Sequence, residues 1–178
     1  MLPHIFTRKR YLALVAIFLV FLGCSDSTGG STSVQTSGTQ PEISTEVQAV
    51  DGSTISVSDF NGVPTAMWFW SPNWGQCRAE AAAVAELNRT FQDNIQFIGV
   101  ASRGDLSQVK EFIERYAVTD LPHIFDDQGD IWRQYRISSQ PAWVFIDANG
   151  NQERVIGALG DTEIRTKLTD FQKSNTGA

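Results

Sequence analysis

The residues with the clearest chemical potential in this 178-residue chain are its two cysteines, Cys24 and Cys77. Cys77 follows Trp74, Gly75 and Gln76. A helix is expected to start here, and free backbone N–H groups and the helix dipole favour a thiolate at such a start. A cycle of thiol–disulfide exchange within one chain needs two sulfur atoms about one helical turn apart. Because Cys24 lies on the far side of a long polar segment, we expect no dithiol cycle by this chain alone.

The other chemically active side chains predict neither a metal site nor a cofactor site. His123 is the only histidine after the N-terminal segment. With Cys77 as the only other soft ligand, it predicts no metal cluster, and we interpret it as a turn or surface residue. Glu80 could accept a proton near the thiol, although an acidic residue in the first helical turn also suits the helix dipole. The acidic run at 126–130 lacks the ligand spacing of a calcium loop and is interpreted as a turn.

The first 23 residues have the pattern of a signal peptide. Three basic residues at 8–10 precede an unbroken apolar run over 12–22, which is shorter than the roughly 20 residues that a membrane-spanning helix needs. The run ends in Phe-Leu-Gly-Cys, which resembles a bacterial lipobox and predicts cleavage after residue 23 with lipidation of Cys24. An ordinary cleaved signal peptide and an uncleaved anchor are the alternatives.

Residues 24–41 are rich in Ser, Thr and Gly and are expected to form a flexible linker, because this composition buries too little apolar surface to fold. With lipidated Cys24, the linker would hold a domain at the extracytoplasmic face of the bacterial cell membrane, in the periplasm or cell envelope. Removal of 1–23, with three basic and no acidic residues, changes the formal charge from -6 to -9. This acidic balance argues against nucleic acid as a partner, because phosphate contacts need Lys and Arg.

Residues 42–175 have the pattern of one α/β domain. Weak alternation on both sides of Asp51-Gly52 predicts an N-terminal β-hairpin. Apolar runs predict buried strands, and Asn149-Gly150 predicts a second hairpin. The expected strands after the first hairpin are 66–70, 95–101, 143–146 and 152–156.

Apolar residues at helical spacing predict helices between these strands. The first should start near Cys77 and the second at Asp105 or Ser107, with a short third helix at 131–135 and a last one around 164–171. Strands that follow helical crossovers should be parallel, and the Asn149-Gly150 pair antiparallel. We therefore expect a mixed central sheet with helices on both faces.

Three segments resemble the TlpA/ResA-type (DsbE-like) family of thiol–disulfide oxidoreductases, which has the thioredoxin fold. They are Trp68-Phe69-Trp70-Ser71-Pro72-Asn73-Trp74-Gly75-Gln76-Cys77-Arg78-Ala79-Glu80, the upstream Val57-Ser58-Asp59-Phe60-Asn61-Gly62, and Gln140-Pro141-Ala142-Trp143-Val144-Phe145-Ile146-Asp147. The resemblance spans about residues 44–173. It implies an active site at the first of these segments and a cis peptide bond between Gln140 and Pro141.

The active-site segment departs from the family pattern. Alignment on Trp70 and Cys77 places Trp74 where the family has its attacking cysteine, with Gly75 and Gln76 between the two positions. Cys77 then takes the place of the resolving cysteine. In the family the first cysteine forms a mixed disulfide and the second resolves it, so this chain lacks the attacking group.

Two functions remain open. The family implies an enzyme of thiol–disulfide exchange, here at most a monothiol that reacts through Cys77 with extracytoplasmic protein thiols or disulfides. The alternative is a non-catalytic module that binds an extended peptide or partner protein beside Gln140 and Pro141. Trp74 and Trp70 would then supply aromatic contacts. The choice depends on whether Cys77 can be reached past Trp74.

Overall fold

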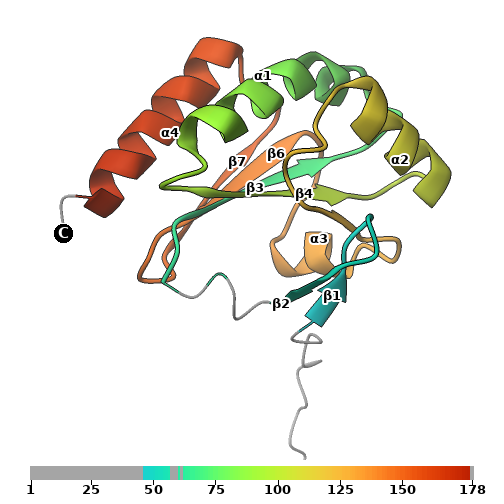
Figure 1. Ribbon diagram of the computed structural model, residues 1–178, viewed down its shortest axis with the longest axis horizontal. Helices are drawn as coiled ribbons and strands as arrows, with labels where there is room; N and C mark the ends of the chain where they lie inside the picture. Colours follow the sequence, from blue (N-terminus) through green and yellow to red (C-terminus); the bar gives the residue numbers. More distant parts are fainter. Residues whose placement is uncertain (1–45, 57–59, 61, 177–178) are drawn as a thin grey trace, which may run out of the picture. The chain divides into compact units, whose positions relative to one another are not determined.

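A computed structural model describes residues 46–56, 60 and 62–176. The expected signal peptide, the linker and Cys24 lie outside these residues. The described elements are β1 (Glu46–Gln48), β2 (Thr54–Ser56), β3 (Thr65–Trp70), α1 (Gly75–Phe91), β4 (Gln96–Ala101), α2 (Leu106–Arg115), β5 (His123–Phe125), α3 (Asp130–Gln134), β6 (Ala142–Ile146), β7 (Gln152–Ile156) and α4 (Asp161–Thr176) (Figure 1). Among them, none of the helices has both the length and the apolar character required to span a bilayer.

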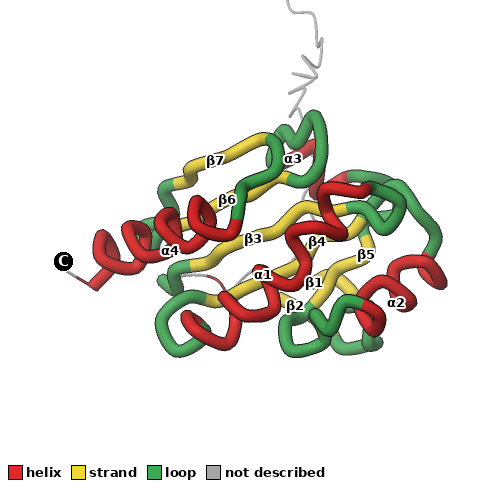
Figure 2. The backbone as a smooth tube through the Cα atoms, turned by 90° about the horizontal axis from the view of Figure 1, so that it is seen from above, coloured by secondary structure: helices red, strands yellow, loops and turns green. Residues whose placement is uncertain are grey.

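Five strands form a mixed sheet in the order β5-β4-β3-β6-β7 (Figure 2). β3 pairs in parallel with β4, and β4 with β5, whereas β6 is antiparallel to both β3 and β7. β1 and β2 form a separate antiparallel pair, joined to the sheet where Ala49 bridges Ile124 of β5. The expected mixed sheet and N-terminal hairpin are thus confirmed.

Side chains of β3 alternate between two hydrophobic cores, one on each face of the sheet. Trp68 and Trp70 pack with residues of α1, α2 and α4, whereas Met67 and Phe69 pack with residues of α3 and the hairpin. Figure 1 shows α1 and α4 over one face of the sheet and α3 with β1 and β2 against the other. All six residues of β3 are buried because both faces are covered, as the continuous apolar run predicted.

The helix cap and the hairpin turn that the sequence predicted are both present. Asp105 caps α2, because its side chain accepts from the Gln108 N–H at 2.9 Å while the Gln108 side chain accepts from the Asp105 N–H at 3.1 Å. Gly150 has a φ of 83° in the turn between β6 and β7, a backbone conformation that glycine adopts without steric cost. β5 has no counterpart among the expected strands, because three residues are too few to show a period.

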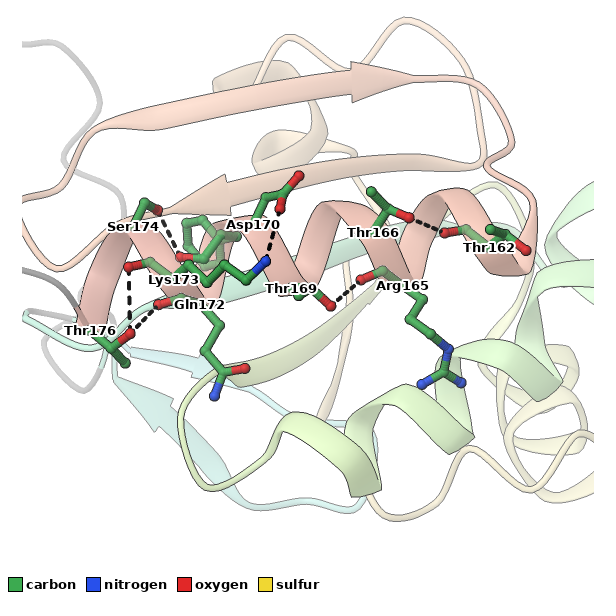
Figure 3. A network of polar contacts seen from close by, with 10 residues as sticks. Thr162, Arg165, Thr166, Thr169, Asp170, Gln172, Lys173, Ser174 and Thr176 are labelled. Atoms are coloured by element: carbon green, nitrogen blue, oxygen red, sulfur yellow. Dashed lines mark hydrogen bonds and ion pairs between the residues drawn. The ribbon is translucent and has the colours of Figure 1, made fainter.

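Side chains of the last helix, α4, donate additional hydrogen bonds to carbonyl groups of its own backbone (Figure 3). Thr166 and Thr169 each donate to a carbonyl oxygen one turn earlier, at 2.8 Å. In the same part of the helix, the Arg165 side chain donates to Glu86 Oε1 of α1 at 2.7 Å. The buried Ile164 belongs to the same core as α1, so α4 covers the sheet beside the helix that carries Cys77.

Candidate functional site

Trp74 lies directly before α1, with 46% of its surface exposed. Its indole Nε1 donates to Gln76 Oε1 at 3.2 Å, and Gly75 and Gln76 are also exposed. Trp74 makes no side-chain cap on the first turn of α1, unlike the Ser, Thr, Asp or Asn that favour this position. An exposed indole therefore lies at the start of α1, at the position where the resemblance led us to expect the counterpart of the family's attacking cysteine.

Cys77 is completely buried in the core on the α1 face. Its sulfur accepts from the backbone N–H of Ser71 at 3.5 Å. Burial raises the pKa of the Cys77 thiol from 9.0 to about 12. The hydrogen bond from the Ser71 N–H lowers this pKa, whereas the nearby Glu80 carboxyl raises it further. At neutral pH the sulfur is therefore a protonated thiol without access to solvent, and the thiol form is not the nucleophile.

Trp70 does not lie on the surface with Trp74. It is completely buried, with its ring centroid 4.3 Å from that of Phe112 and 5.4 Å from that of Trp68. The expected contact between Trp70 and a bound partner is therefore wrong. Trp70 is the last residue of β3, and the core between the sheet and α2 extends that far.

The peptide bond between Gln140 and Pro141 is cis, which confirms the expectation from the family resemblance. The carbonyl of the buried Pro141 accepts from the Gly157 N–H at 2.9 Å. Ala142, the first residue of β6, pairs with Phe69 near the end of β3. The cis-proline loop therefore lies at the same end of the sheet as the segment that leads from β3 to Trp74.

Arg103, in the loop between β4 and α2, joins this site, although no motif in the sequence marks it. Its Nη1 donates to Gln140 Oε1 at 2.8 Å, and its Cζ lies 4.9 Å from the ring centroid of Trp132 in α3. Its backbone carbonyl accepts from Ser71 Oγ at 3.4 Å. Four segments that are distant in the sequence thus meet around one arginine residue, which a linear pattern cannot reveal.

Glu80 does not lie in the first turn of α1, where the helix dipole argument placed it, because α1 already begins at Gly75. Only 4% of its surface is exposed, and its carboxyl oxygens accept from Trp68 Nε1 at 2.9 Å and from the Leu159 N–H at 2.6 Å. Desolvation raises its pKa to about 7, against both hydrogen bonds, which favour the ionised form. Glu80 therefore links α1 to β3 and to the segment before α4.

His123 is also buried, which corrects its interpretation as a turn or surface residue. It lies in β5, with 4% of its surface exposed, and its Nε2 is 2.8 Å from the Val118 carbonyl. Burial lowers the pKa of His123 to about 4, so the ring is neutral at neutral pH and donates through Nε2. Its Nδ1 has no hydrogen-bond partner among the described residues.

The acidic segment after β5 does form a turn, in which the Gly129 N–H donates to the Asp126 carbonyl at 3.1 Å. The Asp126 side chain is buried and accepts from the Trp132 N–H at 2.8 Å. Within the described ranges, no three His, Cys, Asp or Glu side chains are placed to hold a metal ion.

Comparison with known proteins identifies relatives with this fold and with thiol chemistry. The profile of the AhpC/TSA family matches residues 39–154. The soluble secreted antigen MPT53 of Mycobacterium tuberculosis is 30% identical over 101 residues, which is 57% of this chain and 57% of that protein. The thiol-disulfide oxidoreductase ResA of Oceanobacillus iheyensis is 29% identical over 127 residues, 70% of this chain and 65% of that protein.

The match to both relatives therefore spans less than two thirds of their length. Among solved structures, MTB dsbF in its mixed oxidized and reduced forms superposes with a TM-score of 0.68 and 27% identity, over 71% of this chain and 93% of that chain. The fold, the cis-proline loop and these matches agree. The chain belongs to the AhpC/TSA family and is a TlpA/ResA-like, thioredoxin-fold relative of the thiol–disulfide oxidoreductases.

Proposed function

We propose that this protein is an extracytoplasmic, thiol–disulfide oxidoreductase-like module that binds extended segments of other proteins and runs no dithiol cycle itself. One contrast at the start of α1 carries the proposal. Trp74, in the attacking position of the family, is 46% exposed, whereas Cys77, in the resolving position, is completely buried. A half-exposed indole is suited to contact a partner, and a buried, protonated thiol is unsuited to attack one.

The surroundings of Trp74 support binding of an extended segment. Gln140 and Pro141 lie at the same end of the sheet, where an extended chain could hydrogen-bond with exposed backbone and be read by neighbouring side chains. A groove of about 280 Å³ begins at Pro72 and Asn73, directly before Trp74 in the chain, and is lined further by Arg78 and residues of α2. The bound segment would come from an extracytoplasmic protein or peptide.

Monothiol exchange through Cys77 is the second candidate function, favoured by the relatives that are named thiol-disulfide oxidoreductases. In that reaction the Cys77 thiolate attacks a partner disulfide, forms a mixed disulfide and releases the second partner sulfur as a thiolate. The reaction requires α1 or the Ser71 segment to move first, because Cys77 has no exposed surface.

We further propose that lipidation of Cys24 anchors the protein to the membrane through the linker at 24–41, after removal of 1–23. Metabolic labelling with a palmitate analogue should label the wild type and leave Cys24→Ser unlabelled and released from the membrane fraction. Equal labelling of the two proteins would refute the lipid anchor, and it would leave the binding proposal intact.

The binding proposal is tested with a random decapeptide display library selected on the purified full-length protein. Trp74→Ala should weaken the selected peptides by about 30-fold, equivalent to a hot-spot contact of about 2 kcal/mol. Val63→Ala is the control, because Val63 is 39% exposed and precedes β3 at the opposite end of that strand. A library without enrichment over the bare support, or equal binding by Trp74→Ala, would refute the proposal.

Thiol trapping separates the two candidate functions. Wild type and Cys77→Ser are expressed in the cell envelope and blocked with an alkylating agent, and adducts are resolved without reductant. The binding module gives no Cys77-dependent adduct, whereas monothiol exchange gives adducts that the serine variant lacks. As a positive control, Trp74→Cys should reduce insulin if the scaffold retains the arrangement that the family uses for its dithiol.

A further inference from the structure

The surface between Arg103 and Gln140 offers hydrogen-bond donors without acceptors. We propose that Arg103 and Gln140 recognise a carboxylate, so that the preferred partner segment carries Asp or Glu. This proposal rests on the binding function proposed above. This assigns a chemical class to the bound segment and a positioning role to Trp132. The argument has three parts, which concern the placement of the guanidinium, the orientation of the amide and the local charge.

Arg103 is held in one place by contacts on both its backbone and its side chain. Ser71 Oγ donates to its carbonyl at 3.4 Å, and its backbone φ of 59° lies in the left-handed region that non-glycine residues seldom adopt. Its guanidinium lies over the ring of Trp132, with 4.9 Å from Cζ to the ring centroid. Trp132 is itself fixed, since it is 3% exposed and its Nε1 donates to the Val100 carbonyl at 3.3 Å.

The contact with Arg103 determines which end of the Gln140 amide is free. A guanidinium has only donors, so the amide oxygen of Gln140 must face Arg103, and it accepts from Nη1 at 2.8 Å. The amide nitrogen, a donor, is then the group left for a ligand. Arg103 retains further N–H donors beyond the one given to Gln140. Both free groups beside Pro141 therefore require acceptors.

Arg103 also has no carboxylate neighbour, unlike six of the eleven Arg and Lys residues in the described ranges. Six Arg and Lys side chains form ion pairs, namely Arg89, Arg115, Arg133, Arg165, Lys167 and Lys173. No carboxylate among the described residues lies within 4.0 Å of the Arg103 guanidinium. In a chain with a formal charge of -6, an exposed and unpaired guanidinium beside the cis-proline loop is a local positive site that complements an acidic side chain.

A carboxylate fits this donor set better than a neutral acceptor does. Hydrogen bonds from a guanidinium to a carboxylate are charge-assisted and often bidentate, and are about twice as strong as neutral ones. Stacking on Trp132 reduces the side-chain freedom that Arg103 would lose on binding. Water and salt screen an exposed pair, so we expect an effect of about tenfold in affinity rather than an all-or-none selection.

The test repeats the decapeptide selection on four full-length proteins: the wild type, Arg103→Gln, Gln140→Glu and Arg89→Gln. The first variant removes the charge. The second places a carboxylate against Arg103 and so occupies it from within the protein. Arg89→Gln is the matched control, because it makes the same charge change at an exposed residue near the other end of α1.

Wild type and Arg89→Gln should enrich peptides with Asp or Glu, and both site variants should lose that enrichment. For a selected acidic peptide, Arg103→Gln should bind about tenfold more weakly, and the difference should shrink as salt is raised. Selected peptides without acidic enrichment, or enrichment that survives in both site variants, overturn carboxylate recognition and leave the binding function standing. No selectable peptide at all overturns both.

Discussion

Two buried groups should make the stability of this protein depend on pH in opposite directions. Burial raises the pKa of Glu80 from 4.5 to about 7 and lowers the pKa of His123 from 6.5 to about 4, because burial disfavours the charged form of each group. Between about pH 4.5 and 6.5, both side chains are therefore neutral in the folded protein and charged in the unfolded chain.

For Glu80, the folded protein keeps a proton that the unfolded chain loses above pH 4.5. The unfolded state then binds fewer protons, so the free energy of unfolding falls as pH rises towards about 7. The two pKa values of Glu80 differ by about 2.5, and one pKa unit corresponds to about 1.36 kcal/mol, so the total loss is about 3 kcal/mol.

For His123 the sign is reversed. The unfolded chain holds a proton up to pH 6.5 that the folded protein releases above about pH 4, so the free energy of unfolding rises with pH in this window. The gain is again about 3 kcal/mol, from a similar separation of the two pKa values. The contributions of Glu80 and His123 should therefore nearly cancel in the wild type between pH 4.5 and 6.5.

Single substitutions separate the two contributions. As the pH rises from 4.5 to 6.5, the free energy of unfolding of Glu80→Gln should increase by about 2 kcal/mol, because only the His123 contribution remains. His123→Gln, whose amide can still donate to the Val118 carbonyl, should lose about 3 kcal/mol from pH 4.5 to 7. Both variants lose absolute stability through altered hydrogen bonds, so the slope with pH is the readout.

Urea unfolding at half-unit pH steps, followed by tryptophan fluorescence, measures these slopes. The double variant Glu80→Gln with His123→Gln should return to the shallow profile of the wild type, which controls for the titration of all other groups. The reasoning fails if both single variants show slopes of the same sign, or if either follows the wild-type profile within about 0.5 kcal/mol.

Three further predictions follow from contacts elsewhere in the core. Iodoacetamide should modify Cys77 in the native protein at least about 1,000-fold more slowly than in urea at pH 8, because its pKa is raised to about 12; equal rates would show that the thiol is open. Gly99→Ala should lower the free energy of unfolding by about 3 kcal/mol, since a Cβ would lie 2.0 Å from Nδ1 of His123; a neutral effect would contradict this packing. Asp126→Ala should cost about 1–3 kcal/mol in urea unfolding, because it leaves the Trp132 N–H without its acceptor at 2.8 Å; a change within experimental error would contradict that role.

Local patterns in the sequence account for most of the fold. The apolar run around Phe69, the hairpin signal at Gly150 and the cap at Asp105 each act within a few residues, so a linear reading recovers them. The prediction that Trp74 occupies the attacking position of the family also comes from local sequence alone, because it depends only on the alignment of a short segment around position 74. β5 was not predicted, because its three residues are defined as a strand only by their pairing with β4.

The tertiary structure decided which of the candidate side chains are available to a partner. Trp70 and Trp74 look equivalent along the chain, yet the core covers the first completely and leaves the second 46% exposed. Cys77 has no exposed surface in the folded chain, and this burial raises the pKa of its thiol. Arg103 contacts Gln140 because the loop after β4 and the loop before β6 lie at the same end of the sheet. This contact depends on long-range packing, which no local sequence pattern encodes.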